Sequence, residues 1–280
     1  MSDRRVLVTG GSRGIGHAVA VQLATRGWRV TLLARHGRAL QQACRELPGG
    51  GHEAFALDVS DEAAWKRLAP RLGEMHGLVC AAAVLNPIGP IGSYRPADFR
   101  HTLEINLFGT LLAIHTCLPG LRARRGAVVT FSGGGATGPL PRFDAYAASK
   151  AAVVRLTENI AAELADDGVR VNCIAPGFVA TSIHQSTITA GSELAGADYY
   201  EHTRAGLQRG GAPVGIAAEL ACLLLNDDTE APFTGKLISA RWDPWRDADF
   251  RRRLATEPDL AALRRVDDMY FTAVSAEVHA

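Results

Sequence analysis

The sequence predicts an α/β protein with a single doubly wound parallel sheet of about seven strands and helices on both faces. Short runs rich in Val, Ile and Leu recur along the chain and are typical of strands buried on both faces. Longer segments rich in Ala and Leu separate them and suit helices, and this alternation predicts parallel strands joined by right-handed crossovers. The expected strands are residues 5–9, 29–34, 53–57, 77–82, 127–131, 170–175 and 236–239.

The expected helices span residues 16–26, 39–47, 63–72, 99–121 and 146–165. No repeat or Gly/Ser/Pro linker divides the chain, so we expect one domain over residues 1–240. Residues 181–213 break the alternation and are polar, yet they contain tyrosines and histidines. We expect a lid over a site there, with a surface excursion as the alternative. Residues 241–280 begin with Trp242 and Trp245, so we expect an extension that packs on the domain or on a neighbouring subunit.

The composition is that of an ordinary soluble globular protein. Of 280 residues, 47% are hydrophobic and the formal net charge is +1, so the chain lacks the basic footprint of a nucleic-acid-binding protein. We find neither a signal-like start nor a run of 18 apolar residues, and we expect a cytoplasmic protein without membrane contact. The five cysteines form no C-x-x-C pair and the histidines no metal-ligand spacing, so we expect no disulfide framework and no metal site.

A glycine-rich turn follows the first expected strand and leads into the first expected helix. Glycines in such a turn let backbone N–H groups approach a pyrophosphate at the helix N-terminus, where the helix dipole favours negative charge. A lone glycine triplet is weak evidence, but a strand before it and a helix after it are the context of a Rossmann-type dinucleotide site. The residues expected to bind the cofactor here are Gly10, Ser12, Arg13, Gly14, Ile15 and Gly16.

The end of the second expected strand indicates which dinucleotide binds. An acidic residue at this place holds the ribose 2′-hydroxyl of NAD, whereas a basic residue accepts the 2′-phosphate of NADP. This chain has Arg35 there and no Asp or Glu, and Arg13 supplies a second guanidinium. Arginine forks match phosphate oxygens bidentately, so NADP(H) is favoured over NAD(H), with a solvated strand-end arginine as the alternative for Arg35.

Tyr146 and Lys150 are four residues apart, which places them one turn apart on the same face of a helix. A tyrosine hydroxyl ordinarily titrates at about pH 10, and a neighbouring ammonium stabilises the phenolate and lowers that pKa. The pair therefore suits proton exchange at neutral pH. An isolated Tyr-x-x-x-Lys is common by chance, so the surrounding motifs must decide.

Five motifs, in matching order and spacing, resemble the short-chain dehydrogenase/reductase family over residues 5–240. They are T-G-x-x-x-G-I-G at 9–16, Asp58-Val59, the Asn106 of an I-N-L-F-G segment, Y-A-A-S-K at 146–150, and V-N-C-I-A-P-G at 171–177. The resemblance implies an oxidoreductase that reduces a ketone or aldehyde to an alcohol, or catalyses the reverse reaction, on a small molecule. It also implies a homodimer or homotetramer formed through helices 99–121 and 146–165.

The resemblance further implies roles for single residues. Tyr146 matches the catalytic acid/base, Lys150 the residue that lowers its pKa and binds the nicotinamide ribose, and Asn106 the residue whose backbone holds a relay water. Asp58 and Val59 match positions that contact adenine. The segment that seats the cofactor's carboxamide is matched by Pro176, Gly177 and Thr181.

Three departures from the family pattern occur. After the fourth expected strand, the family's Asn-Asn-Ala-Gly is replaced by Cys80-Ala81-Ala82-Ala83, so the side-chain amides that brace the central strands are missing. After the last expected strand, residues 240–245 lack the usual Asp-Gly-Gly. Ser132-Gly133 replaces Ser-Ser, so by simple spacing the serine that polarises the carbonyl falls on Gly133. The glycines at 133–135 allow a bend that brings Ser132 to this place, and a backbone N–H of the run is the alternative donor.

Two other functions stay open at the level of sequence. One is an NAD(P)-using epimerase or dehydratase of a sugar-like substrate, although such relatives have shorter glycine spacing and a larger C-terminal domain. The other is a non-catalytic NADP-binding regulator, suggested by the departures above. Arg142 and Arg204 are either ligands of an anionic or hydroxylated substrate or solvated surface arginines.

Overall fold

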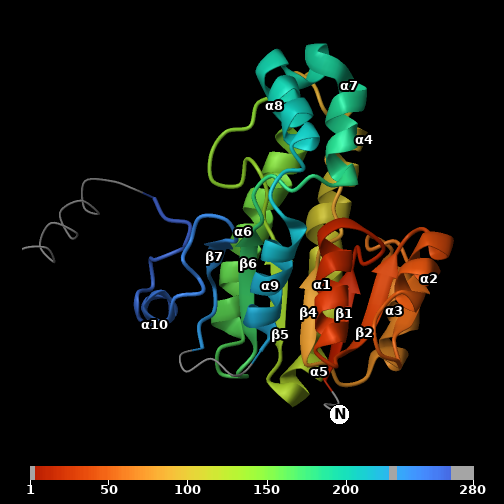
Figure 1. Cartoon of the computed structure of the whole chain (residues 1–280), viewed down its shortest axis with the longest axis vertical. Helices are drawn as coiled ribbons and strands as arrows, with labels where there is room; N and C mark the ends of the chain where they lie inside the picture. Colours follow the sequence, from red (N-terminus) through yellow and green to blue (C-terminus); the bar gives the residue numbers. More distant parts are fainter. Residues whose placement is uncertain (1–3, 227–231, 266–280) are drawn as a thin grey trace, which may run out of the picture.

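Seven parallel strands form one sheet in the order β3-β2-β1-β4-β5-β6-β7 (Figure 1). The computed structural model describes residues 4–226 and 232–265. The strands are β1 (Arg5–Thr9), β2 (Arg29–Ala34), β3 (Glu53–Ala56), β4 (Gly77–Cys80), β5 (Ala127–Phe131), β6 (Arg170–Ala175) and β7 (Leu237–Ser239). The predicted fold class is confirmed, and the strand order reverses between β1 and β4, where ligands bind in sheets of this type.

Helices cover both faces of the sheet because consecutive strand residues point to opposite sides. Val6 and Val8 of β1 pack toward α1 and α9, whereas Leu7 packs toward α3 and α5. The helices are α1 (Gly14–Thr25), α2 (Gly37–Arg45), α3 (Glu62–Leu72), α4 (Pro96–Leu103), α5 (Gly109–Arg124), α6 (Asp144–Glu163), α7 (Gln185–Ala195), α8 (Ala197–Gln208), α9 (Val214–Leu225) and α10 (Ala248–Thr256). Within the described ranges, none of them has the length and apolar character needed to cross a membrane.

Residues 99–121 are helical, as expected, but they do not form one regular α-helix. A π-helical turn, η1 (Glu104–Phe108), separates α4 from α5. Asn106 lies in this turn, and its side chain bonds to groups outside the helix rather than pointing to solvent. Such wide turns insert an extra residue and are frequent at functional sites. Helical periodicity alone does not reveal them, since the residues on either side still favour a helix.

Residues 181–213 fold into a short 3₁₀ turn, η2 (Ser182–His184), followed by α7 and α8, which stand above the sheet in Figure 1. The two ends of this excursion meet, since the Ala212 N–H donates to the Phe178 carbonyl at 2.8 Å. Arg142 Nη1 donates to the Glu193 carbonyl at 2.7 Å and so ties the end of α7 to the loop before α6. Arg204 pairs with Glu201 at 2.6 Å, so both arginines considered for substrate binding have partners within the protein.

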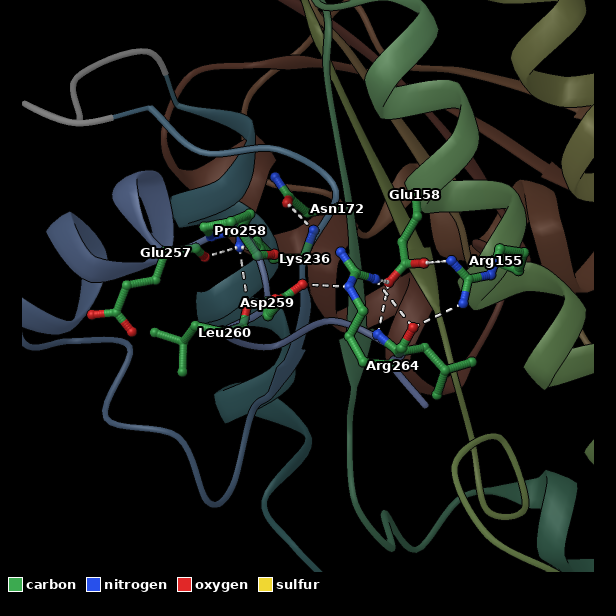
Figure 2. A network of polar contacts seen from close by, with 10 residues as sticks. Arg155, Glu158, Asn172, Lys236, Glu257, Pro258, Asp259, Leu260 and Arg264 are labelled. Carbon is green, nitrogen blue, oxygen red and sulfur yellow. Dashed lines mark hydrogen bonds and ion pairs between the residues drawn. The ribbon is translucent and has the colours of Figure 1, made fainter. Parts of the chain in front are cut away.

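The segment after β7 lies against the edge of the sheet (Figure 2). The Lys236 ammonium donates to the carbonyls of Glu257, Pro258 and Leu260 at 2.6, 3.0 and 2.9 Å. The Leu237 N–H donates to the Ala261 carbonyl at 2.7 Å, so this segment bonds to an edge strand whose N–H groups would otherwise be open. Lys236 is itself buried, and its ammonium therefore holds the segment in place.

We expect Lys236→Met to lower the free energy of unfolding by about 2–3 kcal/mol, because three carbonyls lose a charged donor while the apolar stem is retained. Urea denaturation measures this loss. Arg253→Met is the matched control, since Arg253 belongs to an exposed ion pair with Glu257. Exposed pairs contribute about 0–1 kcal/mol. Equal small losses in the two variants would contradict the role given to Lys236.

Candidate active site

A cavity of about 720 Å³ runs along the carboxyl ends of the strands. Arg35 and Asp58 line it at the β2 and β3 end, and Ser239 and Trp242 line it at the β7 end. The predicted site residues that line it are Gly10, Ser12, Arg13, Gly14, Ile15, Gly16, Arg35, Asp58, Val59, Ser132, Tyr146, Lys150, Pro176, Gly177 and Thr181. Asn106 is 1% exposed and lies behind the wall of the cavity.

The glycine turn leaves no room for side chains where it meets β4. A Cβ atom on Gly10 would lie 2.8 Å from the Ala82 nitrogen, and Gly10 has a φ of +67° that favours glycine. A Cβ atom on Gly16 would lie 2.5 Å from the Gly10 carbonyl oxygen. Glycine is therefore needed at both positions for the turn to pack against the loop after β4 and against the start of α1.

The N-terminus of α1 lies at the same cavity, and in the part of the chain that the structure describes no protein group accepts from its first three N–H groups. Arg13 at the N-cap has extended backbone angles and makes no side-chain cap, and the first turn contains no acidic residue. The free N–H groups and the helix dipole form an anion site. These residues fit the pyrophosphate of a dinucleotide.

Two cationic side chains line the β2 end of the cavity. Arg13 and Arg35 are exposed, and within the described ranges neither forms a salt bridge. Asp58 accepts from the N–H and the hydroxyl of Ser60 at 3.0 and 2.7 Å. Burial raises the pKa of Asp58, but the Ser60 hydrogen bonds and the charges of Arg35 and His101 outweigh it, so the pKa falls below its usual value. This end of the cavity is therefore net cationic and suits an additional phosphate.

Lys150 on α6 is 4% exposed, and its ammonium donates to the Phe131 carbonyl at the end of β5, at 2.8 Å. The ammonium lies 5.8 Å from the centroid of the Tyr146 ring. Burial lowers the pKa of Lys150 to about 8, against the opposing effect of Cys173 and Cys80. Burial, with a smaller contribution from Tyr199, raises the pKa of Tyr146. In the protein alone Tyr146 is thus a protonated phenol, which is the form of a general acid.

The Ser132-Gly133 departure has a clear geometric consequence. A Cβ atom on Gly133 would overlap the Tyr146 hydroxyl oxygen, so Tyr146 occupies the space that a serine at 133 would need. Ser132 is 4% exposed and its N–H donates to the Ile174 carbonyl at 2.9 Å. Among the described residues, the Ser132 hydroxyl and the N–H groups of Gly133 and Gly134 have no hydrogen-bond acceptor. A side-chain hydroxyl and backbone N–H groups, the two kinds of donor expected from the sequence, therefore both lie near Tyr146.

Asn106 braces the loop after β4. Its Nδ2 donates to the Val84 carbonyl and to Ser149 Oγ, both at 2.9 Å, and its Oδ1 accepts from the Val84 N–H at 2.8 Å. The Asn106 carbonyl accepts from the Thr110 hydroxyl at 2.9 Å. A single amide thus links the loop after β4 to η1 and α6, next to residues 80–83 that lack amides of their own.

The lining residues that were not assigned to the site from sequence include a group of ring-bearing side chains: Phe178, His184, Tyr199, His202 and Trp242. The His184 ring stacks on the Phe178 ring at 4.1 Å, and the His202 ring meets the Phe178 ring edge-on at 5.7 Å. These residues come from the segments after β6 and β7. The signal in the sequence was the concentration of rings in an otherwise polar segment, which indicated a lid but not the contribution of each residue.

Comparisons with known proteins agree with this geometry. Residues 4–190 match the family model described as short chain dehydrogenase. The chain is 32% identical to levodione reductase of Leifsonia aquatica over 239 residues, covering 81% of this chain and 89% of that protein. It is 36% identical to D-threitol dehydrogenase of Mycolicibacterium smegmatis over 190 residues, covering 65% of this chain and 73% of that protein.

Solved structures give the same result. A levodione reductase structure matches with a TM-score of 0.75 at 28% identity, covering 85% of this chain and 96% of that one. An NAD⁺-bound xylitol dehydrogenase matches with a TM-score of 0.73 at 26% identity, covering 84% of this chain and 96% of that one. The fold and cavity define a dinucleotide-binding oxidoreductase. The chain belongs to the short-chain dehydrogenase/reductase family, whose members use NAD(H) or NADP(H), and acts on alcohol or carbonyl groups.

We expect Gly133→Ala to displace Tyr146 and to lower the free energy of unfolding by about 1–3 kcal/mol, as overpacking does. Gly134→Ala is the control, because a Cβ atom there would lie 3.4 Å from Leu140 Cδ2, an ordinary contact. Urea denaturation of both variants measures the difference. Equal stability of the two variants would show that Tyr146 does not fill the space beside Gly133.

Proposed function

We propose that the protein is an NADP(H)-dependent oxidoreductase that reduces a small ketone or aldehyde to an alcohol, or catalyses the reverse reaction, with Tyr146 as general acid/base. The observation that carries the proposal is the position of the Tyr146 hydroxyl in the cavity beside Gly133, on the same helix as the buried Lys150 ammonium. A proton donor with a nearby cation is what a carbonyl oxygen needs as negative charge develops on it.

In this proposal each residue of the site has a separate role. When bound, the cofactor supplies or accepts the hydride. Tyr146 donates its phenol proton to the carbonyl oxygen in reduction and accepts it back in oxidation. Lys150 stabilises the phenolate that is left and binds the ribose next to the nicotinamide. Asn106, through its contacts with Val84 and Ser149, keeps the loop and α6 in register beside Tyr146 and holds the relay water with its backbone.

The substrate carbonyl also requires a hydrogen-bond donor. We assign this part to the Ser132 hydroxyl, because it is buried in the cavity wall and has no acceptor among the described residues. Gly133 cannot carry the serine that the family usually has, since Tyr146 fills that space. The backbone N–H groups of Gly133 and Gly134 are the alternative donors.

The choice of NADP(H) rests on the β2 end of the cavity. The guanidinium groups of Arg13 and Arg35, which form no salt bridge among the described residues, line it. Asp58, which matches the adenine-contacting position, accepts a hydrogen bond from the Ser60 hydroxyl. A 2′-phosphate bound there would have the guanidinium groups of Arg13 and Arg35 as cationic partners. Val59 completes the adenine wall, while Pro176, Gly177 and Thr181 line the cavity at the nicotinamide end.

We also propose a homodimer or homotetramer formed through α5 and α6. Phe108, the last residue of η1, and Leu111, in the first turn of α5, are 53% and 38% exposed. Large apolar side chains exposed side by side on a helix are typical of a surface covered by another subunit. The regulator considered from the sequence rests only on the departures at residues 80–83 and 132–133, and no contact among the described residues favours the epimerase.

We expect Tyr146→Phe to lower kcat by 10² to 10⁴-fold or more, because the proton donor is lost while the glycine turn is unchanged. The Kd for NADPH, measured by fluorescence, should change little. Tyr200→Phe removes a hydroxyl from α8 and is the matched control, with activity close to that of the wild type. More than about a tenth of the wild-type rate in Tyr146→Phe would remove Tyr146 from the mechanism.

We expect Arg35→Ser to lower the kcat/KM ratio of NADPH over NADH by roughly 10-fold to 100-fold, the effect of losing one charge-assisted contact to phosphate. Arg45→Ser removes the arginine at the last residue of α2, the helix that follows Arg35, and should leave the ratio unchanged. Steady-state kinetics with both cofactors measure it. A wild type that uses NADH as well as NADPH would contradict the reading of Arg35.

A further inference from the structure

The two ends of the cavity differ in chemistry. Strand order places β2 and β3, with Arg35, on one side of the β1–β4 crossover, and β6 and β7 on the other. Tyr146 lies next to Gly133 after β5, between these two ends. The space lined by Ser239, Trp242 and the lid is therefore beyond the reacting group, on the side away from the Arg35 end. We call the residues Phe178, His184, Tyr199, His202 and Trp242 the ring wall.

Trp242 is held in position by a hydrogen-bonded turn. The backbone N–H of Trp242 donates to Ser239 Oγ at 3.1 Å, and Asp243 Oδ2 accepts from the backbone N–H of Ser239 at 2.8 Å. Trp245, which is 1% exposed, anchors the turn by donating from Nε1 to the Ala240 carbonyl at 2.9 Å. The Trp242 side chain is nevertheless 73% exposed. A rigid turn thus presents a large aromatic surface at the mouth of the cavity.

Arg241 fixes the orientation of this indole. Its guanidinium lies 4.4 Å from the centroid of the Trp242 ring, and its side chain packs close to Gly177. Arginine stacks well on aromatic faces. Arg241 does not line the cavity, so its contact with Trp242 supports the ring rather than supplying a charge to the cavity.

The lid supplies the other rings. Phe178, His184 and His202 form a stacked and edge-on group, and the Tyr199 ring packs on Phe143 at 4.5 Å. Burial, and to a smaller extent His202, lowers the pKa of His184 to about 4. His184 is thus uncharged at neutral pH and offers a polar edge without a full charge.

Charged side chains are scarce at this end of the cavity. From Phe131 through Trp242 the described lining contains no Asp, Glu or Arg, and Lys150 is bonded to the Phe131 carbonyl. Arg142 and Arg204 are bonded within the lid instead. A charged substrate group would lose its hydration there without gaining a partner, which is costly. Aromatic faces, by contrast, favour the flat surface of a ring.

We propose that the ring wall selects an uncharged cyclic alcohol or ketone and that Trp242 is a specificity-determining residue. The reaction in this inference rests on the proposed function, whereas the binding site does not. The ring of the substrate lies against Trp242, and its further oxygen atoms meet the edges of His184, His202 and Tyr199.

Steady-state kinetics with three probes test this substrate selectivity: cyclohexanone, 4-oxocyclohexanecarboxylate (the carboxylate) and hydroxyacetone. We expect the wild type to prefer cyclohexanone over the carboxylate by at least about 10-fold in kcat/KM. Trp242→Ala should raise KM for cyclohexanone about 10-fold with little change in kcat, and should leave KM for hydroxyacetone and the Kd for NADPH within about 2-fold. Trp242→Phe should retain most of the wild-type KM. Ile91→Ala, an exposed apolar residue away from the cavity, is the control.

Tryptophan fluorescence tests binding independently of catalysis. Trp28, Trp65 and Trp245 are buried, so of the four tryptophans Trp242 is the one that a ligand can shield from water. Cyclohexanol added to the NADP⁺-loaded protein should shift the emission to shorter wavelength, and Trp242→Phe should abolish the shift. A shift without turnover of any carbonyl would refute the proposed function and retain the ring wall as a binding site. Preference for the carboxylate, an equal KM change for all three probes in Trp242→Ala, or no shift at all would overturn the inference.

Discussion

The hydrogen bond from the buried Lys150 ammonium to the Phe131 carbonyl is the contact on which the rest of the site depends. It joins α6 to the end of β5, the strand after which the chain turns into the glycine run 132–135. A buried ammonium is costly unless its donors are satisfied, so the position of α6 is fixed relative to the sheet. Tyr146, one turn earlier on α6, is thereby brought against Gly133. The same burial lowers the pKa of Lys150 and raises that of Tyr146, so the geometry and the acidity of the site have a common origin.

Most of the fold follows from local patterns. The apolar runs predicted all seven strands, because strands buried on both faces must be apolar throughout. Their ends were less accurate: β4 ends at Cys80 rather than at residue 82, since the chain must pass close to the Gly10 backbone. The π-turn η1 was not predicted, because it depends on the contacts of Asn106 with Val84 and Ser149, residues distant in sequence.

The two halves of the candidate site differed in how far the sequence could describe them. The dinucleotide half uses consecutive residues in a turn and at strand ends, so spacing placed Gly10 and Arg35 in one cavity. The substrate half is assembled from the lid and from the segment after β7, whose rings meet only in the folded chain. The sequence described the role of Gly133 only in part. Its departure from the family pattern was visible in the sequence, but only the structure shows that Tyr146 fills the space left by the missing side chain.

In the proposed mechanism, burial keeps Tyr146 protonated in the free protein, and nearby positive charge makes its proton available when the oxidised cofactor is present. An ultraviolet difference titration of wild type against Tyr146→Phe isolates the ionisation of this one phenol. We expect a pKa above the ordinary tyrosine value in the free protein and a fall of that pKa by about 1–3 on addition of NADP⁺. An ordinary pKa in the free protein, or the same pKa with and without NADP⁺, would contradict it.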